Sequence, residues 1–487
     1  MVFSAPIFLF GFLPIALLLY FLSPKRLKNI VLLLISLTFY AWGEVFYLIV
    51  MLISIIANYV IGLLLNSAHV KQDNLDVTRH FGSPKLFLVL GVSINLCLLI
   101  TFKYANFLND NVNVLLEAWN FDPINLEPVH LPLGISFFTF NALSYTVDVY
   151  RKQVAVQRNI LDFALYISLF PQLIAGPIVR YKDIAEQISE RNTSLNMFAN
   201  GSRRFIYGLA KKTLIANSLG QVADDIFAIS GNDLTTPIAW IGIIAYSLQI
   251  YFDFSGYSDM AIGLGLMFGF KFLENFNYPY ISKSIREFWR RWHISLSTWF
   301  RDYVYISLGG NRVSKPRVYL NLLIVFILTG FWHGASWNFL IWGLFHGGFL
   351  TLEHAGFSKI LEKTKLPIQH LYVLFVVIVG WVFFRAENLP HALSYIKTMF
   401  NPATMPTTHH QYAQFISSEI LLAFFIGIIL ATPVYPILRE HVASIKSSQK
   451  AIVADMAGLV FLFSLLGLSI LKIASSTYDP FLSLIHI

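Results

Sequence analysis

The sequence predicts an all-α polytopic membrane protein. Of its 487 residues, 56% are hydrophobic and 13% are charged, and that charged share is about half of what a soluble domain carries. Apolar runs of membrane-spanning length recur from one end of the chain to the other. Lysines and arginines cluster in the short loops between these runs, as expected for loops that stay on the cytoplasmic side of a membrane.

Taken in order, the apolar runs predict roughly 11 to 13 membrane-embedded helices. The predicted helices lie near residues 6–22, 30–42, 45–65, 86–102, 131–147, 160–178, 236–252, 258–270, 319–333, 335–353, 370–384, 416–437 and 452–473. Several of them are shorter than the ~20 residues that a spanning helix needs.

Helix breakers interrupt two of these runs. Pro132 and Gly134 lie in LPLGISFF, and Pro171, Gly176 and Pro177 lie in FPQLIAGP. Irregular backbone at membrane depth is tolerated only where protein surrounds it or where it lines a cavity. We therefore expect short re-entrant helices around a cavity.

The distribution of charge predicts an orientation. Lys25, Arg26 and Lys28 follow the first helix, and no small-residue cleavage site does, so this helix is expected to stay uncleaved with its N-terminus outside. Windows without lysine or arginine, 104–150, 213–270 and 398–438, are expected to contain external loops, among them GNDLTT and NPATMPTTHHQ. Residues 271–317 carry nine basic side chains against three acidic ones and are expected at the cytoplasmic face.

Composition also narrows the class of function. The single cysteine, Cys97, lies in an apolar run and has no partner for an internal disulfide, and no Cys/His set has metal-ligand spacing. We therefore expect a lipid-facing or core cysteine and no metal. The net charge of +8 is explained by the basic loops, so nucleic acid is not an expected partner.

The segment REFWRRWHISLSTWFRDYVYISLGG, residues 286–310, has helical periodicity. An aromatic face is predicted to contain Ile285, Trp289, Trp292, Leu296, Trp299 and Tyr303. A polar stripe is predicted to contain Arg286, Arg290, His293, Ser297 and Arg301. One hypothesis is a helix at the membrane interface. The other is that Arg290, Arg291, Arg301 and Trp292 bind a phosphate-bearing molecule beside His293.

His333 lies inside the apolar segment 319–350, in the motif LTGFWHG. An ionisable group at membrane depth is costly and usually faces a protein interior or an aqueous cavity, where it often does chemistry. The alternative is a histidine bound to a neighbouring carbonyl between packed helices. His293 is expected near the inner surface and His333 near mid-membrane, which suggests a path running inward between them.

Other residues of these runs favour structural roles. Gly343 and Gly347 form a small-xxx-small pair, which is typical of close helix packing. His346 lies 13 residues after His333, so on one continuous helix it would point elsewhere, and it is expected to be structural. Asp148, Asp253 and Asp259 either orient polar groups or pair with basic neighbours, and pairing is the favoured alternative.

Six stretches resemble the membrane-bound O-acyltransferase (MBOAT) family, and within it the bacterial AlgI-like branch of alginate O-acetylation proteins. They are EFWRRWHISLSTWFRDYVYISLGGNR, LTGFWHGASWNFLIWGLFHG, MVFSAPIFLFGFLPI, LPLGISFFTFNALSYTVDVYR, LFPQLIAGPIVRY and YFDFSGYSDMAIGLGLMFGF. The resemblance covers most of residues 1–350, whereas residues 351–487 match only in hydropathy. We therefore expect one membrane domain over residues 1–487, with a motif-bearing core and C-terminal membrane helices.

The resemblance implies a helical bundle around a tunnel, in which an acyl thioester from the cytosol meets an acceptor hydroxyl. It also implies a bacterial inner-membrane enzyme that uses acetyl-CoA as donor substrate and holds no bound cofactor. The final acceptor would be an exported polysaccharide such as alginate, reached with a periplasmic acetyltransferase partner. Peptidoglycan O-acetylation and D-alanyl transfer remain open alternatives within the family.

The family's two histidines fall on His333 and His293. A neutral imidazole, with an ordinary pKa near 6.5, takes a proton from a hydroxyl that attacks a thioester. Asn338, Ser336 or the backbone N–H near Gly334 would stabilise the oxyanion, and the sequence does not select among them. The competing class is a proton-coupled transporter or flippase, which the absence of an internal repeat disfavours.

Overall fold

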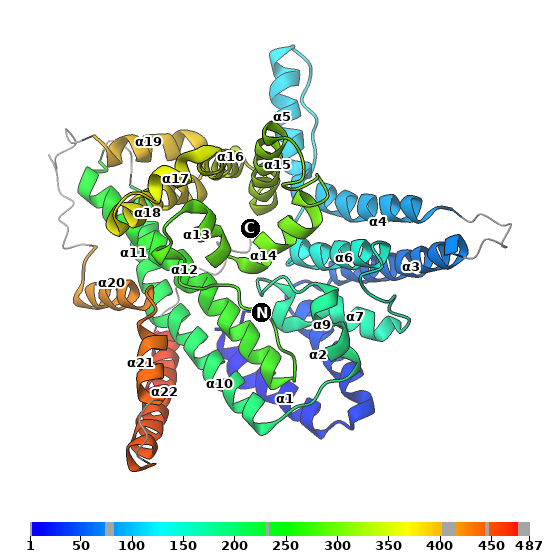
Figure 1. Cartoon of the computed structure of the whole chain (residues 1–487), viewed down its shortest axis with the longest axis horizontal. Coiled ribbons are helices and arrows are strands. Elements are labelled where there is room, and N and C mark those ends of the chain that lie inside the picture. The colour runs from blue at the N-terminus through cyan, green and yellow to red at the C-terminus, as the bar shows by residue number, and fades with distance from the viewer. Residues whose placement is uncertain (1, 74–81, 230–232, 402–414, 444–447, 476–487) are drawn as a thin grey trace. The chain divides into compact units, whose positions relative to one another are not determined.

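The computed structural model of the chain describes residues 2–73, 82–229, 233–401, 415–443 and 448–475 (Figure 1). Every regular element within these ranges is a helix, which confirms the predicted all-α class. The chain divides into two compact units. Unit 1 comprises residues 1–201 and 264–273, and unit 2 comprises residues 202–263 and 274–487.

Unit 1 is built around α6 (Ile135–Tyr150), which packs against α3 (Leu48–Asp73) and α4 (Pro84–Leu99). Gly134 precedes α6 with φ of +71°, and a Cβ there would lie 2.6 Å from the Leu173 carbonyl oxygen, so glycine is required. The other helices of this unit are η1 (Ile7–Phe12), α1 (Leu13–Leu22), η2 (Lys25–Leu27), α2 (Lys28–Ala41), η3 (Ile100–Tyr104), α5 (Ala105–Ala118), α7 (Ile160–Ser168), α8 (Phe170–Leu173), α9 (Tyr181–Ser189) and the start of α10 (Leu195–Ala210).

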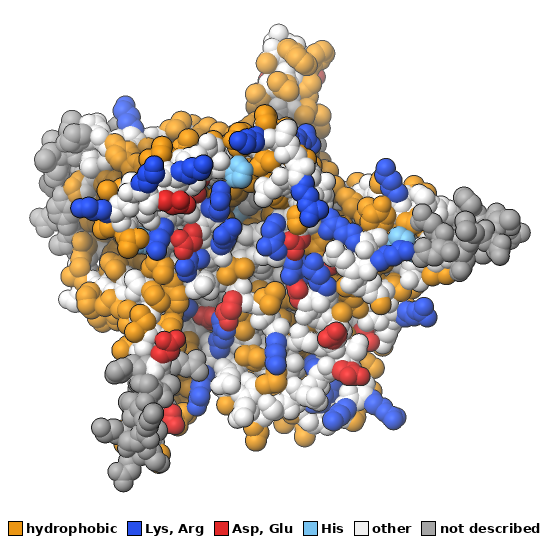
Figure 2. Space-filling model, in the orientation of Figure 1, with side chains coloured by type: hydrophobic (Ala, Val, Ile, Leu, Met, Phe, Trp, Pro, Cys, Tyr) orange, Lys and Arg blue, Asp and Glu red, His pale blue; other side chains and the backbone are white. Residues whose placement is uncertain are grey.

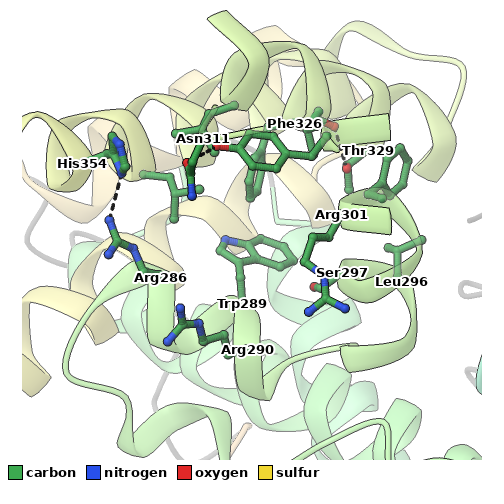
Figure 3. Close-up of a pocket in the computed structure, with 15 residues that line it drawn as sticks. Arg286, Trp289, Arg290, Leu296, Ser297, Arg301, Asn311, Phe326, Thr329 and His354 are labelled. Carbon is green, nitrogen blue, oxygen red and sulfur yellow. Dashed lines mark hydrogen bonds between the residues drawn. The ribbon is translucent and has the colours of Figure 1, made fainter. Parts of the chain in front are cut away.

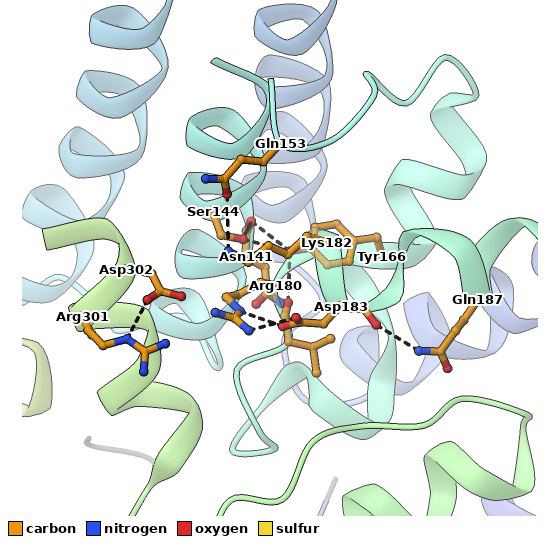
Figure 4. A network of polar contacts seen from close by, with 11 residues as sticks. Asn141, Ser144, Gln153, Tyr166, Arg180, Lys182, Asp183, Gln187, Arg301 and Asp302 are labelled. Carbon is orange, nitrogen blue, oxygen red and sulfur yellow. Dashed lines mark hydrogen bonds and ion pairs between the residues drawn. The ribbon is translucent and has the colours of Figure 1, made fainter. Parts of the chain in front are cut away.

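The predicted helix near 160–178 is broken, as its prolines and glycine indicated. It forms α7 and the single turn α8, and residues 163–181 are buried. The Tyr166 hydroxyl lies 3.1 Å from the carbonyl oxygens of both Asn141 and Val179, while Arg180 forms a two-bonded ion pair with Asp183 (Figure 4). Protein groups thus satisfy this irregular backbone, which is the condition for placing it within a membrane.

Unit 2 carries the segment with the arginine stripe and the helices around it. Its helices are the end of α10, η4 (Lys211–Ala216), α11 (Asn217–Phe227), α12 (Thr236–Met267, whose last turn belongs to unit 1), η5 (Pro279–Ile281), α13 (Ile285–Arg291), α14 (Ile294–Phe300), η6 (Arg301–Tyr305), α15 (Lys315–His333), α16 (Trp337–Leu352), η7 (Glu353–Phe357), α17 (Ser358–Leu361), α18 (Leu366–Arg385), α19 (Leu389–Met399), α20 (Ser418–Leu430), α21 (Val434–Ala443) and α22 (Ser448–Ser475).

Among the described residues, six helices are long and apolar enough to cross a membrane. They are Leu48–Val70, Pro84–Ala118, Thr236–Met267, Lys315–His333, Leu366–Arg385 and Ile452–Ser475, and the shorter apolar helices are Ile7–Leu22 and Ser418–Leu430. The protein is therefore a multi-pass membrane protein. Cys97 is exposed on α4, and the predicted loops GNDLTT and NPATMPTTHHQ fall partly or largely outside the described residues.

Two predictions about the elements are wrong. The run 416–437 was expected as one helix, but it contains α20 and the start of α21, which are separate helices. The runs 236–252 and 258–270 were expected as two helices, but α12 is a single helix of 32 residues. The polar residues that interrupt the hydropathy are paired: Asp253 with Lys212 at 2.8 Å, and Asp259 with Lys211 at 2.7 Å. Since these ion pairs satisfy the charges, the helix continues through the polar stretch, and the expected pairing of both aspartates is confirmed.

Sequence hydropathy also missed several helices, among them α5, α9, α10, α11 and α19, which are too polar or too short to register as apolar runs. In contrast, the close packing expected of Gly343 is confirmed. A Cβ on Gly343 would lie 3.3 Å from Gly330 Cα, so α15 and α16 pack backbone to backbone. This tight pair presents His333 at the end of α15.

Candidate active site

The arginine-bearing segment is not one continuous helix. α13 ends at Arg291, Trp292 is extended, and His293 has φ of 44° and ψ of 56° before α14 begins at Ile294. A non-glycine residue in this left-handed region is uncommon. The periodicity that placed His293 on the arginine stripe therefore fails at His293 itself, and the ring turns inward, 1% exposed.

The aromatic face of this segment does not lie exposed, as a helix at the membrane interface would require. All six of its side chains are buried, and they pack against protein. The Trp289 ring centroid lies 5.2 Å from that of Phe326 on α15 and 5.6 Å from that of Trp342 on α16. The Trp292 centroid lies 4.9 Å from that of Trp381 on α18. The segment is thus held inside unit 2 by aromatic contacts.

His333 is the last residue of α15 and lies in an aromatic enclosure. Its ring centroid is 4.9 Å from those of Trp332 and Trp342, and 5.1 Å from that of Phe384. The side chain is 5% exposed. Three helices, α15, α16 and α18, therefore contribute to a water-poor surrounding for this imidazole.

The structure brings the two histidines to one place. The Trp332 ring centroid lies 6.1 Å from that of His293 and 4.9 Å from that of His333, so both imidazoles flank the same indole. The break at His293 turns its ring into the protein, towards the end of α15. We call His293, Trp332 and His333 the histidine centre.

A cavity of about 300 Å³ opens on the other side of α13 and α14. Three arginines, Arg286, Arg290 and Arg301, line it together with His354, and its apolar lining includes Trp289 and Phe300. Figure 3 shows the three guanidinium groups arranged around the Trp289 indole. We call this cavity the arginine pocket.

The charge of the arginine pocket is only partly neutralised. Arg301 donates to Asp302 at 2.8 Å (Figure 4), whereas Arg286 Nη2 lies 3.2 Å from His354 Nδ1. Burial, together with the nearby Arg286 charge, lowers the pKa of His354 and favours its neutral form, which does not offset the guanidinium charge. In Figure 2, Lys and Arg side chains gather over the region that Figure 1 labels α13 to α17. The pocket is suited to a phosphate-bearing molecule.

A buried carboxylate holds the start of α13. Glu353, at the end of α16, accepts the backbone N–H groups of Ile285 at 2.6 Å and Arg286 at 3.0 Å. An anion at a helix N-terminus satisfies unpaired N–H groups and interacts favourably with the helix dipole. Glu353 thereby fixes the helix that carries Arg286 and Arg290.

The other residues predicted for the site lie apart from the pocket. Arg291 pairs with Glu287 at 2.8 Å and does not line the arginine pocket, and Trp292 is buried in the aromatic cluster. Asn338 Nδ2 donates to the Ala386 carbonyl at 2.7 Å, which ties α16 to the end of α18. Ser336 is the residue before α16, three positions after His333.

The described residues hold no group of three or more His, Cys, Asp or Glu side chains arranged to bind a metal ion. His346 is fully buried, with its ring centroid 5.2 Å from those of both Trp289 and Trp342. Neither of its ring nitrogens has a hydrogen-bond partner among the described residues. Its surroundings are those of a packed core residue, as the sequence indicated.

Comparisons with known proteins agree with this architecture. The family model described as "MBOAT, membrane-bound O-acyltransferase family" matches residues 116–394. The chain is 43% identical to the probable alginate O-acetylase AlgI of Azotobacter vinelandii over 99% of both chains. The chain belongs to the membrane-bound O-acyltransferase family. This MBOAT chain is therefore an acyltransferase, and the resemblance noted in its motifs is confirmed.

Two further relatives mark the range of similarity within the MBOAT family. The chain is 46% identical to the probable alginate O-acetylase AlgI of Pseudomonas aeruginosa, over 87% of this chain and 81% of the relative. It is 39% identical to a peptidoglycan O-acetyltransferase of Helicobacter pylori, over 82% of this chain and 80% of the relative. The matching family model spans both α13–α14 and α15–α16, the elements that carry the histidine centre.

Sequence reasoning missed Asn275, Glu353 and His354. His354 and Glu353 had one usable signal, since they are ionisable residues at the end of the apolar run 335–353, which begins two residues after His333. Asn275, in ENFNYPY, had none, because an asparagine before a proline-containing loop is typical of an ordinary turn. Only the fold places Asn275 beside His293.

Proposed function

We propose that the protein is a bacterial inner-membrane O-acetyltransferase, which moves an acetyl group from a cytosolic thioester donor towards periplasmic O-acetylation of an exported polysaccharide such as alginate. The observation that carries the proposal is the near full-length similarity to relatives named as alginate O-acetylases. The two buried histidines at one indole support it as the reaction centre.

The arginine pocket supports a donor of the coenzyme A type. Acetyl-CoA carries several phosphate charges, which guanidinium groups bind through charge-assisted hydrogen bonds. Arg286, Arg290 and Arg301 converge on one cavity whose apolar wall includes Trp289. In this proposal the phosphates stay at the arginines and the pantetheine arm carries the thioester inward.

His333 acts as general base in the proposed reaction. The acceptor oxygen forms a bond to the thioester carbonyl carbon while its proton passes to the imidazole. The carbon–sulfur bond then breaks, and the departing sulfur takes the proton from the imidazolium. The products are an O-acetyl ester and a free thiol. The aromatic enclosure of His333 excludes water that would hydrolyse the thioester.

A side chain or backbone N–H near His333 is proposed to stabilise the oxyanion. Ser336, three residues after His333, is one candidate, and the backbone N–H near Gly334 is another. Asn338 is a third, although one of its two amide N–H bonds is already donated to Ala386. The two units are proposed to work as one membrane domain, and the acetyl group to pass to a periplasmic acetyltransferase partner and then to the polymer.

Acetyl transfer from labelled acetyl-CoA tests the donor and the direction together. Inside-out membrane vesicles expose the cytoplasmic face, so they should consume external acetyl-CoA, while right-side-out vesicles should not until they are permeabilised. Equal rates from both vesicle types would contradict a cytosolic donor. Release of free thiol without O-acetyl ester would indicate a thioesterase.

Orientation can be measured separately. In a Cys97→Ser background, a single cysteine at Asp122, in the lysine- and arginine-free window, should react with an impermeant thiol reagent from the periplasm. A cysteine at Ser314, in the basic segment, should not. The opposite pattern would reverse the proposed orientation and remove the cytosolic donor site.

A second candidate acceptor is peptidoglycan, favoured by the similarity to the Helicobacter pylori enzyme. Deletion of the gene in its own host, followed by ester analysis of the exported polysaccharide and of the purified cell wall, separates the two. Loss of O-acetyl groups from the cell wall alone would replace alginate by peptidoglycan, and loss of D-alanyl esters would indicate the third activity known in the family.

A further inference from the structure

Asn275 makes a set of hydrogen bonds that converge on one atom. Its side-chain oxygen lies 3.1 Å from His293 Nδ1, 3.2 Å from the Ser295 backbone nitrogen and 2.9 Å from Ser295 Oγ. Its side-chain nitrogen donates to Ser258 Oγ at 3.1 Å. Asn275 is 1% exposed, so its buried amide is satisfied by these protein groups and not by solvent. Ser295 Oγ also lies 3.4 Å from His293 Nδ1.

The direction of these bonds determines the tautomer of His293. A backbone N–H can only donate, so the atom facing the Ser295 nitrogen must be the amide oxygen of Asn275. The same oxygen faces His293 Nδ1, and an amide oxygen can only accept. Nδ1 therefore carries the hydrogen, and Nε2 presents a lone pair.

The backbone of Asn275 holds the same turn. Its carbonyl oxygen accepts the Ile294 N–H at 2.9 Å, and the Arg291 carbonyl oxygen accepts the Asn277 N–H at 2.9 Å. These two bonds flank His293, whose φ of 44° is unfavourable for a side chain with a Cβ. Residues 275–277 thus maintain the conformation that aims the ring.

His293 Nε2 is buried and has no hydrogen-bond partner among the described residues. The ring lies between Phe254, with centroids 4.6 Å apart, and Trp332, with centroids 6.1 Å apart. Trp332 also contacts His333. A buried lone pair without a partner is costly, and such groups occur where a ligand or substrate supplies the missing donor.

We propose that Asn275 is a positioning residue for acyl transfer, which acts by fixing the tautomer and direction of His293 so that Nε2 accepts a hydrogen bond from an O–H or N–H group of the substrate. This inference rests on the proposed function and deepens it. Burial also lowers the pKa of His293 to about 3, so the ring remains a neutral acceptor at physiological pH.

Four variants test this role: Asn275→Ala, Asn275→Asp, His293→Ala and the double variant Asn275→Ala/His293→Ala. Asn275→Ala should lower kcat for acetyl transfer about 10- to 100-fold, as expected for a misdirected reactive group, with donor KM changed less than about threefold. Asn275→Asp keeps an accepting oxygen and should recover most of the lost kcat. Asn277→Ala is the matched control. Asn277 holds the turn through its backbone N–H, which the substitution keeps, and its side chain is exposed, so this variant should equal wild type.

The double variant separates positioning from a structural role. If Asn275 acts through His293, the double variant should be no slower than His293→Ala, because the two losses are not additive. Additive losses, or an Asn275→Ala variant with wild-type kcat, would overturn the positioning role while leaving the proposed function intact. If Asn275→Ala does not fold, failure of Asn275→Asp to sustain activity in folded protein would overturn it equally. A wild-type protein without acetyl transfer would overturn the proposed function and this inference with it.

Discussion

The arginine pocket and the histidine centre occupy two sides of the same short stretch of chain, yet their environments are opposite. The pocket carries three guanidinium groups and Arg290 is exposed, whereas both histidines are at least 95% buried among aromatic rings. Trp289 separates them, since it lines the pocket and packs against Phe326 and Trp342. Under the proposed function, the charged pocket suits recognition of a phosphate-bearing donor, and the water-poor histidine centre suits chemistry on its thioester.

The break between α13 and α14 makes this division possible. On one regular helix, residues 286, 290, 293, 297 and 301 would face the same way. Because His293 adopts a left-handed conformation, its ring leaves that face and joins the histidine centre, while Arg286, Arg290, Ser297 and Arg301 line the pocket. One segment thus serves both regions. The predictions below change each region in turn.

The largest effect is expected in the histidine centre. His333→Ala should lower kcat for acetyl transfer by at least about 100-fold, since general-base catalysis contributes roughly 10²–10⁴-fold, with yield and membrane insertion unchanged. Steady-state kinetics on purified protein measure it. His346→Leu is the matched control: neither ring nitrogen of His346 has a hydrogen-bond partner in the described structure, so an apolar side chain should keep activity within about threefold. Similar losses in both variants would mean that the region is only structural.

Changes in the arginine pocket should act on donor binding alone. The double variant Arg290→Gln/Arg301→Gln should raise the donor KM by about 100-fold or more, because each of the two charge-assisted hydrogen bonds lost contributes roughly 1.5–3 kcal/mol, with kcat nearly unchanged. Wild-type donor KM should also rise more steeply with salt than that of the variant. Arg291→Gln, outside the pocket, is the control. A rise in acceptor KM instead would remove the donor from this cavity.

The pH dependence of stability should distinguish the two regions more finely. Burial lowers the pKa of His293 from 6.5 in the unfolded chain to about 3 in the folded protein. Between these two pH values the unfolded state binds a proton on His293 and the folded state does not. His293 then contributes full stability above pH 6.5 and loses up to about 1.4 kcal/mol per pH unit as the pH falls towards 3. Thermal midpoints in detergent between pH 4 and 7.5 measure it. His293→Gln should flatten the acid side of the curve, and an unchanged slope would contradict a neutral buried ring.

The smallest effect is expected from Glu353, the carboxylate that holds the start of α13. Glu353→Gln keeps one accepting oxygen but removes the negative charge at the start of α13, and should lower the free energy of unfolding by about 1 kcal/mol. Donor KM should rise slightly, because Arg286 and Arg290 lie on that helix. Glu362→Gln, an exposed neighbour, is the control. An equal loss in both variants would show that the cap at α13 has no special role.

The class of the protein followed from the sequence, because hydrophobic run length and loop charge are local properties of the chain. The all-α class, the breaks at Pro171 and Gly134, and the close packing at Gly343 needed no tertiary information. Motif similarity located His333 and His293. Hydropathy wrongly divided α12 into two helices at its polar stretch. The helix continues there because Asp253 and Asp259 pair with Lys212 and Lys211, which lie elsewhere in the chain.

The arrangement of the site was decided by tertiary structure alone. No local pattern indicates that His293 leaves its helical stripe, because the left-handed turn is held by Asn275, 18 residues earlier in the chain. No pattern brings His354 to Arg286 either, since 68 residues separate them. Periodicity predicts which residues share a helix face only while the helix continues. Where hydrogen bonds from a distant segment end it, the direction of a side chain such as His293 depends on those bonds.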